Sequence, residues 1–491
     1  MGSETAKQSK KFHMLLMPFF ATSHIAPFTD LAFHLAAAMP DIVEATVAVT
    51  PANASVVRSA LARRGPNDAT ATVKVTTYAF PAVDGLPPGI ENLSAVKGED
   101  WLHINAAALN EALMRPGQES LIREISPDVI ITDMHFFWNV DVAADLGVPC
   151  ITFHVIGTFP TLAMSHMELA GVNETATDGV VTVPHFPAPD IRIPLTELPY
   201  FLRNQEEEVS GRDVITDDRM GSALSRCFGL AVNTFFDLEH GYCELYVANG
   251  YVKRAYFLGP LSLPLPEAVP GNSQCIDWLD KKPNNSVVYL CFGTFVPVSD
   301  AQLQELALGL EASGKPFLWV VRSDSWAPPE EWTERVGDRG MVVTGWAPQT
   351  AILAHPAVGA FVTHCGWNSV METVVAGVPV LTWPVVFEQF ITERFVTQVL
   401  AIGARMSPEG DGVRSTRHKE NELVPAQVVT QAVSAFMEPG GEGDAARSRV
   451  KELSVKARAA MADGGCSHRD LRRLIDDLMK ARSAGAGATP L

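Results

Sequence analysis

Short apolar runs alternate along the first half of the chain with longer segments in which apolar positions recur every three or four residues. The short runs predict strands at Phe12–Phe20, Ala45–Thr50, Val129–Thr132, Cys150–Phe153 and Leu230–Asn233. The longer segments predict helices, among them Pro27–Met39 and Trp138–Leu146. Because strands that alternate with helices build parallel sheets covered by helices, this pattern indicates an α/β fold.

A proline-rich segment interrupts the alternation near the middle of the chain. Residues Phe257–Pro266 include three prolines, which is typical of an extended linker. The alternation then restarts, with predicted strands at Val287–Phe292, Pro316–Val321, Met341–Thr344, Ala360–Thr363 and Val380–Trp383. The glycines and charges of Met406–Glu422 predict a mobile insertion.

A chain of 491 residues is too long for one ordinary core. We predict two facing, doubly wound, Rossmann-like domains. The predicted divisions are an N-terminal domain at 11–256, a linker at 257–266, a C-terminal domain at 267–470, and a C-terminal helix and tail at 471–491.

Composition narrows the possible partners and the compartment. The formal net charge of −18 disfavours a nucleic-acid partner, because no basic surplus exists to neutralise phosphates. The seven cysteines are scattered and form no C-x-x-C pair, which fits a reducing compartment. The chain has no run of about 18 apolar residues that could form a membrane-spanning helix. We predict a cytoplasmic monomer that has no membrane span.

One strand end carries the features of an anion-binding site. The strand that ends near Thr363 is followed by a glycine turn at Gly366 and by a helix that begins near Ser369. Such a turn presents main-chain N–H groups and the positive end of a helix dipole, and His364 and Asn368 add side-chain donors. No G-x-G-x-x-G or Walker A pattern occurs, so these residues would hold a diphosphate differently from an NAD or ATP site.

Residues on either side of this turn suit the other parts of a nucleotide sugar. Glu372 lies one helical turn further on, where a carboxylate can accept bonds from two ribose hydroxyls. Trp346 offers a flat face to a pyrimidine, and Glu388 and Gln389 follow a strand where they can bind sugar hydroxyls.

Each of these residues also has an ordinary structural alternative. A lone His364 fits a structural hydrogen bond, and a lone Ser369 fits a helix N-cap. Trp346 and Trp367 fit core aromatics. Only their shared order and spacing favour the functional interpretation.

That order and spacing match a known signature. The matching residues are Trp346, Ala347, Pro348, Gln349, His355, Pro356, Gly359, His364, Cys365, Gly366, Trp367, Asn368, Ser369, Glu372, Gly377, Val378, Pro379, Trp383, Pro384, Glu388 and Gln389. They closely resemble the signature of the plant family-1 UDP-sugar glycosyltransferases, at the family's own length and without a gap. Weaker resemblance covers nearly all of the chain.

The resemblance implies the GT-B fold, in which the N-terminal domain binds the acceptor and the C-terminal domain binds the UDP-sugar. It also assigns residues of this chain to four parts of the donor: Trp346 and Ala347 to the uracil, Gln349 and Glu372 to the ribose, His364, Asn368, Ser369 and Thr294 to the phosphates, and Trp367, Glu388 and Gln389 to the sugar. The closing glutamine of the signature goes most often with glucose.

Sugar transfer with inversion needs a base that deprotonates the acceptor hydroxyl. His24 is predicted in the loop between the first strand and the first helix, and Asp133 follows the strand Val129–Thr132. By position alone, His24 also fits a polar loop residue and Asp133 a helix cap. The resemblance identifies the two as the family's catalytic His and Asp, although His135 lies near enough to compete for Asp133.

One position departs from the family pattern. Members that bind the sugar's 6-hydroxyl often place Thr or Ser after the strand Cys150–Phe153, and the aligned position here holds Val155 beside His154. Because Val155 has no side-chain donor, it weakens the prediction of glucose.

The acceptor is predicted only by class. Aromatic residues gather around the predicted ends of the strands that carry His24 and Asp133, namely Phe19, Phe20, Phe136, Phe137, Trp138, Phe153 and Phe159. Each fits a core position singly, but an apolar wall beside a base suits a small hydrophobic acceptor such as a flavonoid, another phenolic or a terpenoid.

The leading hypothesis is therefore an inverting UDP-glycosyltransferase, with glucose as the predicted sugar and the UDP-sugar as a substrate, so that no cofactor is needed. No Asp-x-Asp occurs in the chain, which argues against metal-dependent donor binding. The alternatives are an enzyme that forms a C-glycoside on a phenolic ring, and a nucleotide-sugar-binding protein without transfer activity. A dinucleotide-dependent oxidoreductase is disfavoured by the missing glycine fingerprint.

Overall fold

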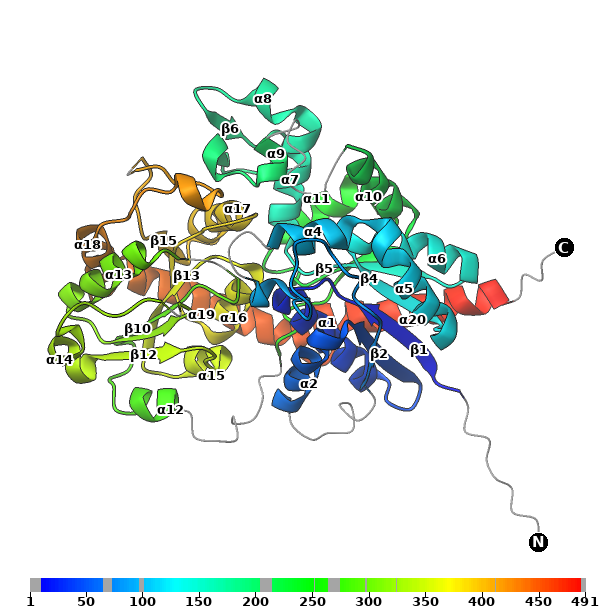
Figure 1. Cartoon of the computed structure of the whole chain (residues 1–491), viewed down its shortest axis with the longest axis horizontal. Coiled ribbons are helices and arrows are strands. Elements are labelled where there is room, and N and C mark those ends of the chain that lie inside the picture. Colours follow the sequence, from blue (N-terminus) through cyan, green and yellow to red (C-terminus); the bar gives the residue numbers. More distant parts are fainter. Residues whose placement is uncertain are drawn as a thin grey trace, which may run out of the picture.

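The computed structural model describes residues 10–64, 73–96, 101–203, 214–250, 252–263, 274–295, 298–323, 325–410 and 412–486. Residues 264–266 of the predicted linker lie outside this set. The described chain forms two parallel sheets, each accompanied by helices, which lie side by side in Figure 1.

The first sheet has seven strands in the order β3-β2-β1-β4-β5-β8-β9. Its strands are β1 (Phe12–Met17), β2 (Val43–Val49), β3 (Val73–Thr77), β4 (Val129–Asp133), β5 (Cys150–His154), β8 (Gly229–Val232) and β9 (Ala255–Phe257). Every neighbouring pair is parallel. The chain turns back at β1, so that the sheet extends in one direction through β2 and in the other through β4.

Helices cover both faces of this sheet. Successive residues of a strand point to opposite faces, so each strand contributes side chains to a core on either side. The helices of this part are α1 (Thr22–Ala38), α2 (Ala54–Arg63), α4 (Trp101–Leu109), α5 (Glu111–Ile125), α6 (Asn139–Leu146), α7 (Thr158–Ala170), α8 (Val172–Thr175), α9 (Tyr200–Arg203), α10 (Val214–Arg226) and α11 (His240–Ala248), with a small hairpin of β6 (Val180–Thr182) and β7 (Arg192–Pro194). On β1, Met14 and Leu16 join the core under α1, whereas Leu15 and Met17 join the core on the other face.

The second sheet repeats the same winding with six strands in the order β12-β11-β10-β13-β14-β15. Its strands are β10 (Val287–Cys291), β11 (Phe317–Val321), β12 (Gly340–Thr344), β13 (Val358–Thr363), β14 (Val380–Thr382) and β15 (Gly403–Arg405). Its helices are α12 (Gln274–Leu279), α13 (Asp300–Ser313), α14 (Trp332–Val336), α15 (Gln349–Ala354), α16 (Trp367–Ala376), α17 (Gln389–Arg394), α18 (Ala426–Phe436) and α19 (Glu442–Met461).

The last helix, α20 (Cys466–Ala486), returns to the first sheet and begins earlier than the predicted residue 471. Its Asp470 accepts from the main-chain N–H of Phe257 at 2.8 Å, and its Asp477 accepts from the hydroxyl of Tyr256 at 2.9 Å. Helix α20 is thereby attached to edge strand β9.

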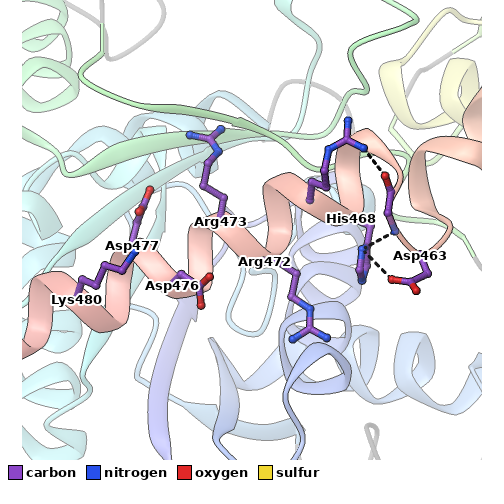
Figure 2. Close-up of a pocket in the computed structure, with 9 residues that line it drawn as sticks. Asp463, His468, Arg472, Arg473, Asp476, Asp477 and Lys480 are labelled. Atoms are coloured by element: carbon purple, nitrogen blue, oxygen red, sulfur yellow. Dashed lines mark hydrogen bonds and ion pairs between the residues drawn. The ribbon is translucent and has the colours of Figure 1, made fainter.

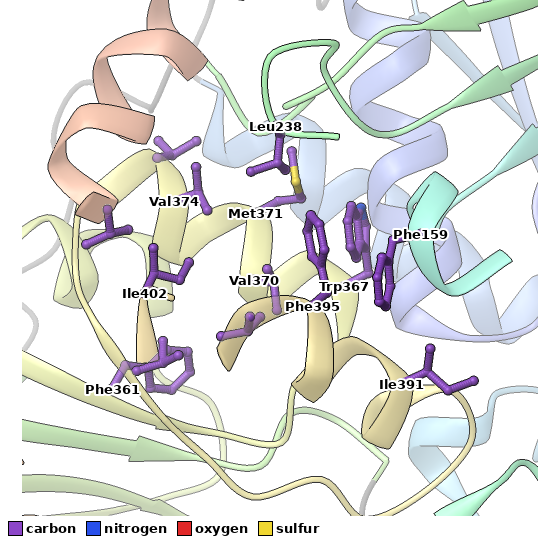
Figure 3. Close-up of a cluster of buried hydrophobic side chains, with 14 of the residues drawn as sticks. Phe159, Leu238, Phe361, Trp367, Val370, Met371, Val374, Ile391, Phe395 and Ile402 are labelled. Atoms are coloured by element: carbon purple, nitrogen blue, oxygen red, sulfur yellow. The ribbon is translucent and has the colours of Figure 1, made fainter. Parts of the chain in front are cut away.

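A shared apolar core joins the two halves. Figure 3 shows Trp367 of α16 beside Phe159 of α7 and Phe395, which follows α17. The indole N–H of Trp367 donates to the carbonyl of Asn233 at 2.7 Å. Gly157 lies so close that a Cβ at this position would be 2.2 Å from the indole ring. Burying a tryptophan at such a site stabilises the native arrangement by about 3–5 kcal/mol relative to alanine.

The predicted mobile insertion 406–422 is instead tied to the first half of the chain. The N–H of Thr416 donates to the carbonyl of Thr196 at 3.0 Å, and its hydroxyl donates to the carbonyl of Leu198 at 2.7 Å. Ser415 is fully buried. The glycines and charges predicted a solvated loop because composition cannot show that a segment packs against another domain.

Candidate active site

The site lies where the winding of each sheet reverses. In the first sheet the reversal falls between β1 and β4, and Met17 is paired with Thr132 just before the chain reaches His24 and Asp133. In the second sheet it falls between β10 and β13, where Cys291 is paired with Thr363. Ligands of open α/β sheets bind beyond the carboxyl ends of the strands at such a switch point.

His24 and Asp133 form a hydrogen-bonded pair. Nδ1 of His24 lies 2.7 Å from Oδ2 of Asp133. Asp133 is 1% exposed, whereas a fifth of the His24 side chain is exposed. With Nδ1 held by the carboxylate, Nε2 of His24 is the nitrogen that can accept a proton from a substrate.

The predicted loop position of His24 is wrong, because α1 begins at Thr22 and His24 lies in its first turn. The prediction placed Pro27 at the helix start, where proline is favoured. Pro27 instead lies inside the helix, and its missing N–H leaves the carbonyl of Ser23 without the usual intrahelical donor.

Asp133 also binds a second imidazole. Its Oδ1 accepts from the main-chain N–H of His135 at 3.2 Å and lies 2.6 Å from Nδ1 of the same residue. Burial would raise the pKa of Asp133, but the neighbouring His24 and His135 hold this pKa well below its ordinary value. The carboxylate is therefore ionised throughout the pH range in which histidine titrates.

The same three residues are the ones that could hold a metal ion in the part of the chain that the structure describes, since their ligand atoms lie within 4.8 Å of one another. Both carboxylate oxygens of Asp133 already bind imidazole Nδ1 atoms. This bonding fits a base and its supporting carboxylate.

The start of α16 offers main-chain donors to an anion. Its N-cap is Gly366, and no side chain caps the helix. His364 lies beside it and close to two glycines. A Cβ added at Gly293 would be 2.6 Å from the imidazole of His364, and a Cβ added at Gly366 would be 2.4 Å from it. Burial lowers the pKa of His364 to about 4, so the imidazole is neutral near pH 7. A neutral His364 and the N–H groups of the first turn are thus suited to phosphate oxygens.

Three of the expected donor-binding side chains form one network. Nε2 of Gln349 donates to the hydroxyl of Ser369 at 3.0 Å and to Oε2 of Glu372 at 2.7 Å. Burial raises the pKa of Glu372 to about 7, although the bond from Gln349 lowers it. A half-buried carboxylate of this kind gains from hydroxyl donors such as those of a ribose.

Asn368 and Trp346 both meet the first domain. The side-chain amide of Asn368 donates to the carbonyl of Ser23 at 2.7 Å. Trp346 is 60% exposed, and the guanidinium of Arg63 lies 5.7 Å from its ring centre. Ala347 follows as a buried residue. An exposed indole two residues after the end of β12 is available to stack on a base.

The indole of Trp367, a residue that the resemblance assigned to the sugar, is directed into the domain interface. This side chain is 3% exposed and packs between the domains, as described above. What this residue brings to the start of α16 is its main-chain N–H. The spacing of the signature gives the position of Trp367 on the helix but not the direction of its side chain.

The residues expected at the sugar lie at the start of α17. Glu388 is the N-cap, and burial raises the pKa of its carboxyl, whereas the charge of the nearby His24 lowers it. Oε1 of Gln389 accepts from the N–H groups of Val385 and Val386 at 3.0 and 3.1 Å, so the amide nitrogen remains to face a ligand. Thr294 is half-buried in the turn after β10.

The prediction of an aromatic wall beside the base is wrong, because these residues do not form a surface. The seven residues are at most 5% exposed, so they form core: Phe19, Phe20, Phe136, Phe137, Trp138, Phe153 and Phe159. Val155 is also buried, in the core that covers α1. Strand-end position alone could not separate inward from outward side chains.

Sequence reasoning missed a second aromatic group that spans both domains. Trp101 of α4 lies 6.1 Å between ring centres from both Phe295 and Phe387, and 6.0 Å from Tyr200. All four are half-buried. Phe387 directly precedes Glu388 and has a left-handed backbone (φ 53°), which is costly for a bulky residue. Phe387 lies within the signature, and that position was the one sequence feature that could have identified it.

A surface depression along α20 is a separate feature (Figure 2). It is lined by cations and carboxylates, and His468 lies 3.6 Å from Asp463. It borders neither switch point.

Two parallel, doubly wound domains with a base on one and an anion-binding helix start on the other define the GT-B class of glycosyltransferases. Residues 265–407 match the family model described as "UDP-glucoronosyl and UDP-glucosyl transferase". Scopoletin glucosyltransferase of Nicotiana tabacum is 35% identical, over 97% of this chain and 99% of its own length. UDP-glucose flavonoid 3-O-glucosyltransferase 7 of Fragaria ananassa is 32% identical, over 97% and 98%.

Solved structures agree. UGT73P12 of Glycyrrhiza uralensis, complexed with glycyrrhetinic acid 3-O-monoglucuronide, superposes with a TM-score of 0.85 at 31% identity, over 97% of each chain. UGT71G1 of Medicago truncatula, complexed with UDP-glucose, gives 0.75 at 25% identity, over 95% of this chain and 98% of its own. This chain belongs to the plant UDP-glycosyltransferase family and is a UDP-dependent glycosyltransferase.

Among the described residues, none of the helices combines the length and apolar character needed to cross a membrane. The cytoplasmic location, the monomeric state and the lack of a nucleic-acid partner stay predictions from the sequence.

Proposed function

We propose that this enzyme transfers glucose from UDP-glucose, with inversion and without a metal ion, to a hydroxyl group of a small hydrophobic acceptor. The observation that carries the proposal is the pair of His24 and Asp133, 2.7 Å apart, at the switch point of the first sheet. The turn that bears His24 is bonded to Asn368 at the start of α16, so the base stands beside the proposed phosphate site.

The proposed step begins with the acceptor hydroxyl hydrogen-bonded to Nε2 of His24. The acceptor oxygen attacks the anomeric carbon as its proton passes to Nε2, and the bond from that carbon to the UDP oxygen breaks. The electron pair leaves with UDP. Asp133 stabilises the imidazolium that forms, which is the role of a carboxylate behind a histidine base.

The leaving UDP gains negative charge, and the start of α16 supplies the stabilisation. N–H groups of the first helical turn, together with His364 and the hydroxyl of Ser369, would face the phosphates. In the proposed mechanism these groups stabilise the negative charge of the leaving UDP, so that no divalent ion is needed. Gln349 and Glu372 would hold the ribose, and Trp346 would stack on the uracil with the main chain of Ala347 at its edge.

Glucose is the proposed sugar because Gln389 is the closing glutamine of the signature, which goes most often with glucose. Glu388 and Gln389 are the residues that would bind the hydroxyl groups of the sugar. Gln389 uses Oε1 to fix the turn at Val385 and Val386, which orients its amide N–H₂ group as a donor to a sugar hydroxyl. Thr294 and the main-chain N–H of Trp367 would contact the donor where its sugar is joined to the phosphates. Val155 is buried and is not part of this proposed contact.

The proposed acceptor class rests on the second aromatic group. Trp101, Tyr200, Phe295 and Phe387 provide half-buried aromatic faces contributed by both domains. Flat or fused-ring compounds suit such a surface. The relatives named for scopoletin and for a flavonoid support acceptors of this kind.

The test is a mass-spectrometric screen of UDP-glucose, UDP-galactose and UDP-xylose against mixed phenolic and terpenoid acceptors. We expect hexosylated products with UDP-glucose as the preferred donor, which acid hydrolysis returns to the free acceptor. Products that resist acid would show a C-glycoside, and preference for another donor would refute the assignment of glucose. The absence of product from every pairing would refute the proposed acceptor class.

A further inference from the structure

His135 gives the proposed base an unusual setting, since one buried carboxylate serves two histidines. Oδ2 of Asp133 binds His24 at 2.7 Å, and Oδ1 binds His135 at 2.6 Å. A supporting carboxylate of this kind has one negative charge to share. Any share that is taken by His135 is lost to His24.

The side chain of His135 is held in place by its neighbours. The residue lies in a short 3₁₀ turn, Met134–Phe136, that directly follows β4. Its imidazole stacks on Phe19 with ring centres 4.2 Å apart and an angle of 18° between the planes. Its ring centre is 5.6 Å from that of His24, and 21% of its side chain is exposed. Phe19 also meets His24 edge-on, so it fixes the spacing of the two imidazoles.

We propose that His135 is a positioning residue that limits the basicity of His24 by binding the second oxygen of Asp133 and by repelling a second positive charge. The inference rests on the proposed role of His24 as the base. In the native enzyme it extends transfer to lower pH, because His24 then releases its proton more readily. His135 acts through Asp133 and takes no part in the bond-making step.

The other charged and titratable groups around the pair can be identified. His154 of β5 is buried, and this burial lowers its pKa to about 4, so it is neutral near pH 7. Burial raises the pKa of Tyr78, which follows β3, and the charge of Asp133 contributes to that increase. From the second domain, the carboxyl of Glu388 interacts with His24. Besides Asp133, His135 and Glu388 are therefore the groups whose charge acts on His24.

The experiment compares pH profiles of kcat/KM for the acceptor, measured at saturating UDP-glucose, for the native enzyme and two variants. His135→Phe keeps a ring against Phe19 but removes the nitrogen, and His135→Asn keeps an N–H donor for Asp133. We expect the acid limb in His135→Phe to move up by about half to one pH unit, which lowers transfer at pH 6 about three- to tenfold. In His135→Asn the shift should be smaller. His240→Phe, at an exposed histidine, is the matched control and should not move the limb.

A second readout is independent of transfer. The His24 imidazole, assigned from the signal that disappears in His24→Ala, is titrated by NMR in the complex with UDP, and its midpoint should rise in both His135 variants. An unmoved limb with an unmoved midpoint would overturn the inference, because a residue that only fills space would affect kcat or stability alone. If His135→Phe does not fold, the His135→Asn comparison decides in the same way. Full activity of His24→Ala would instead refute the proposed base, which separates the two failures.

Discussion

The side-chain amide of Asn368, at the start of α16, donates a 2.7 Å hydrogen bond to the main-chain carbonyl of Ser23, in the first turn of α1. Pro27 explains why this carbonyl is available, because proline has no N–H to give to the residue four positions earlier. The first domain thus offers an unfilled acceptor, and the second domain fills it. The bond ties the turn that carries His24 to the helix start that is proposed to hold the phosphates.

Replacing Asn368 by Ala should release this turn and remove one phosphate contact. We expect kcat to fall about ten- to hundredfold, because small displacements of a catalytic group are costly, and KM for the donor to rise. Ser369→Ala is the matched control, since it removes a neighbouring hydroxyl but no bond to Ser23. It should mainly raise KM. An unchanged kcat in Asn368→Ala, measured by initial rates, would contradict the proposed link.

Gly157→Ala tests the contact between the domains. Its added methyl group would meet the indole of Trp367 at 2.2 Å, so the two domains must shift apart. We expect a loss of about 1–3 kcal/mol in the free energy of unfolding and a lower transfer rate, measured by chemical denaturation and initial rates. Gly221→Ala is the control, because no atom lies within 4 Å of its added Cβ. Equal stability of the two variants would show that the interface is not tightly packed.

The affinity for UDP-glucose should depend on pH through Glu372. Its pKa is raised to about 7 by burial, so the unliganded site binds a proton below that pH. Ribose hydroxyls donate to the ionised form, which makes binding release this proton. We expect affinity to rise with pH up to about 7 and then level off, with a slope that approaches tenfold per pH unit below it.

Calorimetry with UDP-glucose checks this dependence, because its diphosphate has no ionisation in that range. Glu372→Gln should bind more weakly at pH 8 and lose the slope. His364 titrates near pH 4 and does not interfere. A slope that survives in Glu372→Gln would assign the proton to another group.

Much of the site could be predicted from the sequence, because strand ends in a doubly wound sheet converge. Asp133 and His364 each end or follow a strand beside a switch point, and the pattern of apolar runs was enough to place them there. The family resemblance assigned Gln349, Ser369 and Glu372 to one bound donor, and in the structure the three side chains are hydrogen-bonded to one another.

What the sequence did not indicate is the direction of individual side chains and the packing of distant segments. Trp367 lies in the signature, yet its indole fills the domain interface. Pro27 resembled a helix start but lies within the helix. Residues 406–422 resembled a free loop, because their contacts with Thr196 and Leu198 connect parts of the chain that are far apart in sequence.

The central claim is that His24 removes the acceptor proton during transfer. The direct measurement is the single-turnover rate of sugar transfer by His24→Ala to the best acceptor, with UDP affinity measured on the same sample and His240→Ala as the control. We predict a rate about 10²–10⁴ times lower than that of the native enzyme, with UDP affinity unchanged and with the control at the native rate. A His24→Ala variant that transfers sugar at the native rate would contradict the claim.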